Sequence, residues 1–252
     1  MRESKPILLS KYSNKLASIK DKIMFSLFPR TCPFCDEIIS MNESQCLKCA
    51  GKVMVVGQPR CLKCGRPIHD SETEYCEECE KRKHLFYKGI SAYVYSDIVK
   101  KSIYMFKYSN RRYYAKTYGE TIGKEFFDEI KSWECDVLVP VPIHRERYRN
   151  RGYNQAELLA REISKYVRIP VDSKVIIRTV NTLPQKELDV NGRKNNLEKA
   201  FKITKSVVQY KKIILVDDIF TTGSTIDACA EIFLAAGVYK IYFISLSIGI
   251  GI

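Results

Sequence analysis

Eight of the ten cysteines form four C-x-x-C pairs, and no other feature of the sequence restricts the fold as strongly. The intervals between successive pairs are ten, eleven and eleven residues. A two-residue spacer lets both thiolates of a pair bind one tetrahedral zinc ion, and two pairs complete a structural four-thiolate site. Disulfide bonds are the alternative, but this regular spacing, without a recognisable secretion signal, favours zinc. The predicted ligands are Cys32, Cys35, Cys46, Cys49, Cys61, Cys64, Cys76 and Cys79.

The cysteine segment is also an internal repeat, which bears on how the pairs combine. The first pair recurs 29 positions later and the second pair 30 positions later. Duplication favours two zinc ions bound in sequence, one per repeat, although pairing of the first with the third pair and the second with the fourth stays open. With eight thiolates available, we expect His69 and His84 to be solvated rather than to act as ligands. The sequence therefore predicts a double zinc ribbon over residues 31–84.

The net charge of +13 is distributed unevenly along the chain. Residues 32–80 contain five basic and nine acidic residues, whereas residues 81–252 contain thirty basic and eighteen acidic ones. Neutralising nucleic-acid phosphates requires an excess of Lys and Arg on the contacting surface, and the ribbon segment lacks it. We interpret the ribbons as a scaffold or protein-docking module, with direct DNA binding by them as the alternative.

The segment before the ribbons has the period of a basic amphipathic helix, predicted over residues 1–30. Its apolar face either packs on the rest of the protein or contacts a partner or a membrane surface. No apolar run is long enough to span a bilayer, so we expect a cytoplasmic protein, associated with membranes only through partners. The apolar positions of this helix are Leu9, Tyr12, Leu16, Ile19, Ile23 and Leu27.

From about residue 90 to residue 252, short β-branched runs alternate with helical periodicity, which is typical of an α/β domain with a mostly parallel sheet flanked by helices. We predict strands within residues 136–142, 174–180, 211–218 and 240–248. Helices are expected from apolar stripes over residues 156–167 and 226–236. Cys229 falls within the second stripe and Cys135 has no neighbouring base, so neither is expected to be a nucleophile.

Two adjacent acids and a hydroxyl-rich turn follow the apolar run before residue 217. In an open parallel sheet, ligands bind beyond the carboxyl ends of the strands, where Asp217 and Asp218 are expected. The next segment, Thr221, Thr222, Gly223, Ser224 and Thr225, opens a helix whose free amides and dipole favour an anion. A ribose 5-phosphate carries both vicinal hydroxyls for the acids and a phosphate for the turn.

The stretch "IILVDDIFTTGST" closely resembles the signature of type I phosphoribosyltransferases, which binds 5-phosphoribosyl 1-pyrophosphate (PRPP) with magnesium. Together with "VPVPIHRERYRNRGYNQAELLA", "LPQKELDVNGRKNNLEKAF", "FKYSNRR" and the ribbons, the chain resembles the competence-associated ComF family, ComFC type. The resemblance implies a type I phosphoribosyltransferase fold, with Asp217 and Asp218 at the ribose and its magnesium and residues 221–225 at the 5-phosphate. It places Lys107 near the pyrophosphate and makes residues 181–196, with Gln185, Lys186 and Arg193, the flexible loop of that family, a mobile lid over the leaving group; an ordinary exposed connection is the alternative. Arg145 follows the first predicted strand at the sheet edge of the acidic pair, where its guanidinium suits the pyrophosphate.

Two functions stay open. The first is a PRPP-binding protein that handles incoming single-stranded DNA in natural competence, with phosphoribosyl transfer as its implied chemistry. The second is a non-catalytic adaptor for single-stranded nucleic acid or protein partners, with a regulatory phosphoribosyl site. Residues 100–116 favour DNA contact because six basic residues alternate with aromatic ones. The expected DNA contacts are Lys100, Lys101, Arg111 and Arg112. The sequence identifies neither a catalytic residue nor a pocket for an accepting base.

Overall fold

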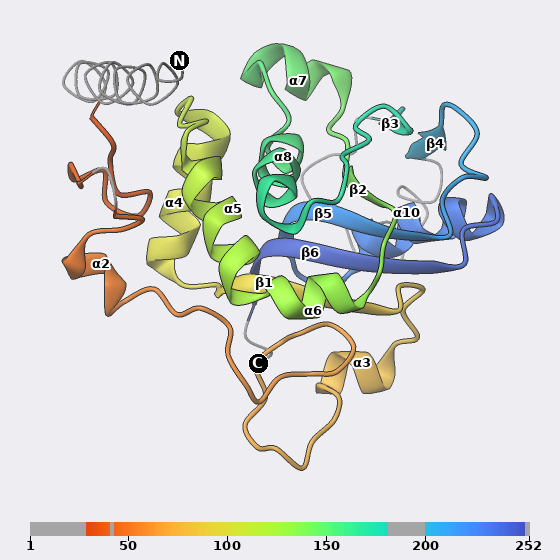
Figure 1. Ribbon diagram of the computed structural model, residues 1–252, viewed down its shortest axis with the longest axis horizontal. Helices are drawn as coiled ribbons and strands as arrows, with labels where there is room; N and C mark the ends of the chain where they lie inside the picture. The colour runs from red at the N-terminus through yellow and green to blue at the C-terminus, as the bar shows by residue number, and fades with distance from the viewer. Residues whose placement is uncertain (1–28, 41–42, 181–199, 250–252) are drawn as a thin grey trace, which may run out of the picture. The chain divides into compact units, whose positions relative to one another are not determined.

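The computed structural model describes residues 29–40, 43–180 and 200–249 (Figure 1). The chain divides into two compact units, Met1–Gly51 and Lys52–Ile252. The predicted N-terminal helix lies outside the described residues except for its last two positions. Within the described ranges, no helix is long and apolar enough to cross a membrane. The predicted ribbon segment, residues 31–84, spans the division between the two units.

The second unit is built from alternating strands and helices. Four parallel strands form one sheet in the order β1-β6-β5-β2, and two antiparallel strands, β3 and β4, form a separate small sheet. The elements are α2 (Leu47–Ala50, in the first unit), α3 (Glu77–Lys81), β1 (Lys88–Val94), α4 (Asp97–Tyr108), α5 (Tyr114–Glu125), α6 (Phe127–Ser132), β2 (Val137–Pro140), α7 (Arg145–Arg151), α8 (Gln155–Val167), β3 (Ile176–Arg178), β4 (Phe201–Ile203), β5 (Lys212–Phe220), α10 (Ser224–Ala235) and β6 (Lys240–Ile248).

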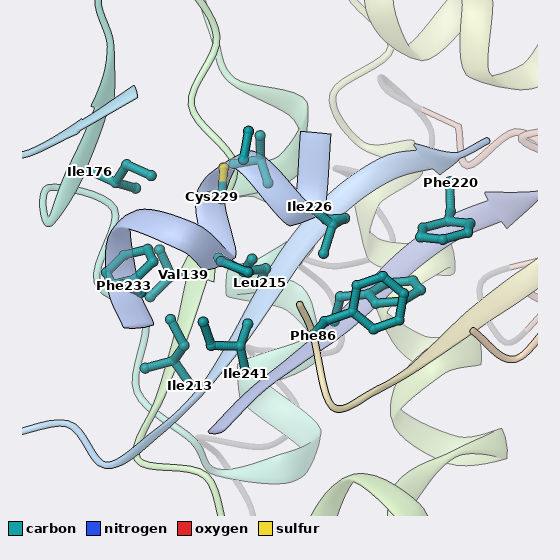
Figure 2. Close-up of a cluster of buried hydrophobic side chains, with 14 of the residues drawn as sticks. Phe86, Val139, Ile176, Ile213, Leu215, Phe220, Ile226, Cys229, Phe233 and Ile241 are labelled. Atoms are coloured by element: carbon teal, nitrogen blue, oxygen red, sulfur yellow. The ribbon is translucent and has the colours of Figure 1, made fainter. Parts of the chain in front are cut away.

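The central position of β5 follows from its apolar run. Alternate residues of a strand face opposite sides of the sheet, and a strand covered on both sides needs apolar residues at every position. Ile213 and Leu215 belong to the cluster that contains Ile226, Cys229 and Phe233 of α10 (Figure 2). The intervening strand residues are equally buried and face the other way, and α8 contacts both β5 and β2. The predicted α/β class with a mostly parallel sheet is confirmed.

The strand predicted within residues 174–180 forms, but it does not extend the parallel sheet. After α8, Val171 makes a single bridge with Leu138 at the outer edge of β2. The chain then leaves that edge, and Ile176 of β3 pairs with Ile203 of β4 in the antiparallel hairpin. Since β3 does not pair with β2, β2 is an edge strand. The main sheet has four strands within the described residues.

The second repeat of the cysteine segment is part of the α/β core. Cys61, Cys64 and Cys76 lie in the same buried cluster as Phe86 and Phe220. Backbone hydrogen bonds join this repeat to β1, including one from the Gly89 amide to the Lys63 carbonyl at 2.9 Å. The second ribbon is therefore not a tethered module, whereas the four cysteines of the first repeat lie in the other unit.

Candidate functional site

The two acids lie toward the carboxyl end of β5, one of the two inner strands. Asp217 pairs in register with Ser245 of β6, and its Oδ1 accepts a hydrogen bond from the Asp218 amide at 2.8 Å. Asp218 receives two further contacts: Lys107 Nζ of α4 lies 2.9 Å from its Oδ2, and Gln155 Nε2 donates to the same oxygen. Residues from α4 and α8 are thus brought to the end of one strand, and each engages the second carboxylate.

Gln155 is held in place by the start of its own helix. Asn154 caps α8 by accepting a hydrogen bond from the Ala156 amide at 3.1 Å, and its side-chain amide donates to the Val141 carbonyl just after β2. Arg151 donates to Gln155 Oε1, so the amide group of Gln155 is oriented with its NH₂ toward Asp218. The position of Gln155 at the site therefore depends on the Asn154 cap, which ties the start of α8 to the end of β2.

The pKa of Asp217 is raised from 3.8 to about 7, first by burial and then by the negative charge of Asp218. Its hydrogen bond from the Asp218 amide and the positive charges of Lys107 and Arg178 act in the opposite direction. Burial also lowers the pKa of Arg178, and the neighbouring charge of Arg147 adds to this effect. A ligand that donates hydroxyl hydrogen bonds would be matched to this pair, because carboxylates accept such bonds.

The hydroxyl-rich loop, residues 221–225, follows β5 directly and leads into α10. Gly223 is the N-terminal cap residue of α10 and has φ +74°, a left-handed conformation that glycine adopts without strain. Thr222 Oγ1 and Ser224 Oγ lie 2.9 Å apart. Within the described part of the chain, the amides of Thr222 and Gly223 donate no hydrogen bond. Free amides at a helix N-terminus form an anion-binding arrangement.

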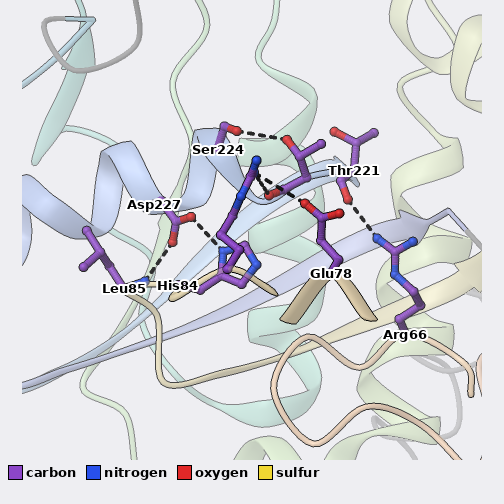
Figure 3. Close-up of polar contacts among 9 residues, drawn as sticks. Arg66, Glu78, His84, Leu85, Thr221, Ser224 and Asp227 are labelled. Atoms are coloured by element: carbon purple, nitrogen blue, oxygen red, sulfur yellow. Dashed lines mark hydrogen bonds and ion pairs between the residues drawn. The ribbon is translucent and has the colours of Figure 1, made fainter. Parts of the chain in front are cut away.

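The carbonyl groups of this loop are held by the second ribbon (Figure 3). Arg66 Nη2 donates to the Thr221 carbonyl at 2.9 Å, and Arg82 Nη1 donates to the Thr222 carbonyl at 3.0 Å. Beneath the loop, His84 Nδ1 lies 2.8 Å from Asp227 Oδ2 in the first turn of α10. The expectation that His84 is solvated is wrong, because its ring stacks on Phe86 in the core. His69 is exposed, as expected.

The eight predicted zinc ligands gather into two clusters of four. Within each cluster the sulfur atoms lie within 4.8 Å of one another, which fits a tetrahedral zinc ion with four thiolate ligands. Pairing is sequential, so the interleaved alternative is wrong. The clusters are Cys32, Cys35, Cys46 and Cys49 in the first unit, and Cys61, Cys64, Cys76 and Cys79 in the second.

The two remaining cysteines are core residues. Cys135 and Cys229 are buried, and burial raises the pKa of the Cys135 thiol to about 12 and that of Cys229 well above its ordinary value. A thiol with a raised pKa is protonated at neutral pH and is a poor nucleophile. The expectation that neither cysteine is a nucleophile agrees with this environment.

The other predicted site residues are only partly brought together. Lys107 contacts the acid pair, while Arg145 is exposed in the first turn of α7. The predicted lid residues Gln185, Lys186 and Arg193 lie outside the described residues. On α4 and the turn after it, Lys100, Lys101 and Arg112 are exposed and Arg111 is half-buried.

The aromatic residues near these cations divide into two sets. Phe106 and Tyr114 are core residues, whereas Tyr104, Tyr108 and Tyr113 are 59%, 65% and 44% exposed. The Tyr104 and Tyr108 rings are 4.9 Å apart, and Arg151 lies over the Tyr108 ring at 5.1 Å. An exposed aromatic and cationic surface therefore runs from α4 to α7, although two of the five aromatic residues between positions 100 and 116 belong to the core.

Sequence reasoning missed Gln155, Arg178, Arg66 and Arg82 at this site. Gln155 and Arg178 are ordinary polar residues in segments interpreted by their apolar periodicity, so their sequence carried no signal. The two ribbon arginines could have been noticed, because Arg66 occupies the repeat position at which the first ribbon has Glu37.

Comparison with known proteins agrees with this architecture. The family model of the double zinc ribbon domain matches residues 23–80. Competence protein F of Haemophilus influenzae is 28% identical over 173 residues, covering 67% of this chain and 76% of the relative. Competence protein ComFC of Bacillus subtilis is 27% identical over 206 residues, covering 79% and 82%. DNA utilization protein YhgH of Escherichia coli K12 is 28% identical over 165 residues, covering 64% and 72%.

Among solved structures, a purine phosphoribosyltransferase from Pyrococcus horikoshii Ot3 matches 51% of this chain and 80% of its own chain, at 15% identity and a TM-score of 0.32. The fold and the two cysteine clusters define a double-zinc-ribbon protein with an open parallel α/β domain and a polar site at the carboxyl end of the inner strand β5. The resemblance to the ComF family, ComFC type, is confirmed by these relatives.

Proposed function

We propose that this protein binds PRPP at the carboxyl end of β5. The proposal depends on one observation: two groups suited to different parts of PRPP are adjacent in the chain. These are the carboxylates of Asp217 and Asp218, and the loop with free amides that begins three residues later. The carboxylates would accept hydrogen bonds from the ribose 2- and 3-hydroxyls. The amides of Thr222 and Gly223, the loop hydroxyls and the dipole of α10 would hold the 5-phosphate.

The cations around the acid pair suit the pyrophosphate of the same ligand. Lys107 lies against Asp218, and Arg178 lies near Asp217 with Arg147 as its own neighbouring charge. Pyrophosphate would bring several negative charges to these cations. Magnesium would arrive with the ligand, since Mg²⁺ is usually bound by one or two carboxylates together with substrate phosphates. In that arrangement Asp217 is the freer carboxylate, because Asp218 is already engaged by Lys107 and Gln155.

The biological role is proposed from the relatives. Their names refer to competence and to DNA utilization, and we propose a role for this chain in handling incoming DNA. Phosphoribosyl transfer to a nitrogen nucleophile, with pyrophosphate leaving, is the chemistry that the site would allow. Positioning and charge stabilisation would supply most of the catalysis.

Isothermal titration with PRPP and Mg²⁺ tests the binding site. We expect a dissociation constant on the micromolar scale for the wild type and no measurable binding for the double variant Asp217→Asn, Asp218→Asn, because amides replace both charged acceptors. Glu231→Gln, which removes an exposed carboxylate from α10, is the matched control and should bind as the wild type does. Full-strength binding by the double variant would exclude this site.

A second function, a non-catalytic adaptor for single-stranded DNA, is favoured by the aromatic and cationic surface. Tyr104 and Tyr108 offer exposed rings on α4, and Arg151 lies against one of them. Bases of any sequence can stack on such rings while cations follow the phosphates. Arg112 is exposed and lies over the buried Tyr153 ring at 4.7 Å, so a further cation is held at the same end of α4.

The salt dependence of oligonucleotide binding tests this surface. Log affinity against log salt should have a slope of about −0.7 for each phosphate neutralised on a single strand. Changing Arg111 and Arg112 to alanine should reduce the slope by about one to two units on the same basis. Removing residues 1–51, the first unit, should leave it nearly unchanged. Loss of DNA binding on that removal, with PRPP binding retained, would instead identify the first unit as the DNA-binding part.

A further inference from the structure

The two ribbon repeats have the same backbone geometry in the turn around their first C-x-x-C pair. In the first repeat the Cys32 amide donates to the Glu37 carbonyl at 2.8 Å, and in the second the Cys61 amide donates to the Arg66 carbonyl at 2.7 Å. The residue after each second cysteine has a positive φ, 64° at Asp36 and 73° at Gly65. Equivalent positions of the two repeats can therefore be compared residue by residue.

The repeats differ at the residues that contact the loop over residues 221–225. The position of Glu37 in the first repeat is taken by Arg66 in the second, which donates to the Thr221 carbonyl. The position of Lys52 is taken by Arg82, which donates to the Thr222 carbonyl. The second repeat thus has the same backbone framework but carries two arginine side chains that the first repeat lacks at these positions. Both arginines donate hydrogen bonds to adjacent carbonyl groups of one loop.

These two hydrogen bonds determine where the free amides point. In a planar trans peptide, the carbonyl of one residue and the amide of the next point in opposite directions. Holding the Thr221 carbonyl toward Arg66 therefore directs the Thr222 amide away from the ribbon. Arg82 directs the Gly223 amide in the same way. The arginines bind the back of the loop, and its anion-binding amides are presented on the opposite side.

Three further contacts limit movement of this loop. Asp227, in the first turn of α10, accepts from the Leu85 amide at 2.9 Å and contacts His84 Nδ1 at 2.8 Å. A Cβ at Gly223 would lie 2.8 Å from His84 Cε1, so the loop rests directly on the histidine ring. Arg66 is only 8% exposed and its Nε is buried without a hydrogen-bond partner, so its guanidinium group is enclosed beneath the loop.

The arginines are in turn fixed by the second cysteine cluster. Arg66 follows Cys64 by two residues, and Arg82 follows Cys79 by three, with its amide bonded to the Glu78 carbonyl at 3.0 Å. A zinc ion joining Cys61, Cys64, Cys76 and Cys79 would hold both chain segments together and so set the spacing of the two guanidinium groups.

We propose that the second zinc ribbon positions the loop over residues 221–225, through Arg66 and Arg82, so that zinc in the second cluster raises the affinity of the loop for a phosphate-bearing ligand. Arg66 and Arg82 are positioning residues in this account. The affinity part of the proposal rests on the proposed phosphate-binding role of the loop, whereas the positioning part does not. The first ribbon has Glu37 at the equivalent position, which carries no cationic donor for a loop carbonyl.

The test compares Arg66→Met with Arg66→Lys and with Glu37→Gln, the matched change at the equivalent position of the first repeat. Each variant is assayed for zinc content, for PRPP binding by titration in the presence of Mg²⁺, and for hydrogen exchange at the amides of Leu85 and Asp227. Arg66→Met should retain two zinc ions, weaken PRPP binding about tenfold and exchange faster at both amides. Arg66→Lys, which keeps the charge and a donor, should recover part of the affinity, and Glu37→Gln should match the wild type.

The zinc link is tested with the equivalent ligand variants Cys79→Ser and Cys49→Ser. Cys79→Ser should lose one zinc ion and resemble Arg66→Met in binding and exchange, whereas Cys49→Ser should lose one zinc ion and leave both unchanged. The proposal is overturned if Arg66→Met binds PRPP and exchanges as the wild type does, a result that does not depend on folding of the cysteine variants. If the wild type itself does not bind PRPP, the proposed function fails, and the exchange rates alone decide the positioning role.

Discussion

Replacing Asp217 with asparagine should make the protein progressively more stable than the wild type as the pH rises from 5 to 8. The pKa of Asp217 is raised from 3.8 to about 7, so the unfolded carboxyl group ionises at a lower pH than the folded one. The stability that this group contributes is complete below its unfolded pKa and is lost as the pH rises through its folded pKa. Asparagine does not ionise, so the variant escapes that loss.

The magnitude follows from the pKa difference. Between pH 5 and pH 7 each pH unit changes the free energy of unfolding by about 1.4 kcal/mol, or roughly 2 to 3 kcal/mol in total. Asp217 is partly exposed and faces Lys107 and Arg178, both of which lose a counter-charge in the variant, so we expect a gain of about 2 kcal/mol. Because Asp217 is also a proposed ligand contact, the same change should weaken PRPP binding.

Urea unfolding followed by circular dichroism at pH 5, 6, 7 and 8, at a constant free zinc concentration, measures the effect. The exposed carboxylate change Glu231→Gln provides the control and should give a stability difference that does not vary with pH. If the curves of stability against pH for the wild type and Asp217→Asn are parallel, the burial of Asp217 does not raise its pKa, and the reasoning is refuted.

Two further predictions concern the metal and the loop. Metal analysis should find two zinc ions per chain. Cys61→Ser should lower the melting temperature of the α/β unit more than Cys32→Ser, because of these two cysteines only Cys61 lies in the core of that unit. Equal effects would contradict the conclusion that the second ribbon and the α/β domain share one core. Gly223→Ala should destabilise the protein by about 1 to 3 kcal/mol in thermal or urea unfolding. The alanine would combine a φ of +74° with Cβ contacts of 2.8 Å to His84 and 3.0 Å to Phe220. An unchanged stability would mean that the loop does not pack against the histidine ring.

The order and burial of the elements could largely be predicted because apolar periodicity reports which face of an element is covered. The stripe predicted over residues 156–167 coincides with the buried face of α8, and the apolar run before Asp217 is the inner strand β5. The separate β3–β4 hairpin could not be predicted, since a short apolar run gives no information on which edge its strand joins. Pairing depends on the whole sheet, including the bridge between Leu138 and Val171.

At the candidate site, local signals were sufficient for the residues of one continuous segment and insufficient for those brought from elsewhere. Asp217, Asp218 and the loop are adjacent in sequence, so their shared position at a strand end follows from the strand itself. Gln155 reaches the same place because α8 packs on β5, and Arg178 approaches it from β3 of the separate antiparallel pair. The burial of His84 also depends on a long-range contact, its partner Asp227 being 143 residues away.

The unequal use of the two ribbon repeats has a consequence for mutational tolerance. A saturation mutagenesis scan selected for ligand binding should find the non-cysteine positions of the first repeat permissive, including Glu37 and its partner Lys48, which form an exposed ion pair. The equivalent positions of the second repeat should tolerate few substitutions, with Gly65 restricted by its approach of a Cβ to within 2.7 Å of the Gly89 carbonyl and Arg66 by its bond to Thr221. The two copies of the duplicated motif would then tolerate different substitutions. Only in the second copy would the tolerated residues be limited by contacts with the loop over residues 221–225.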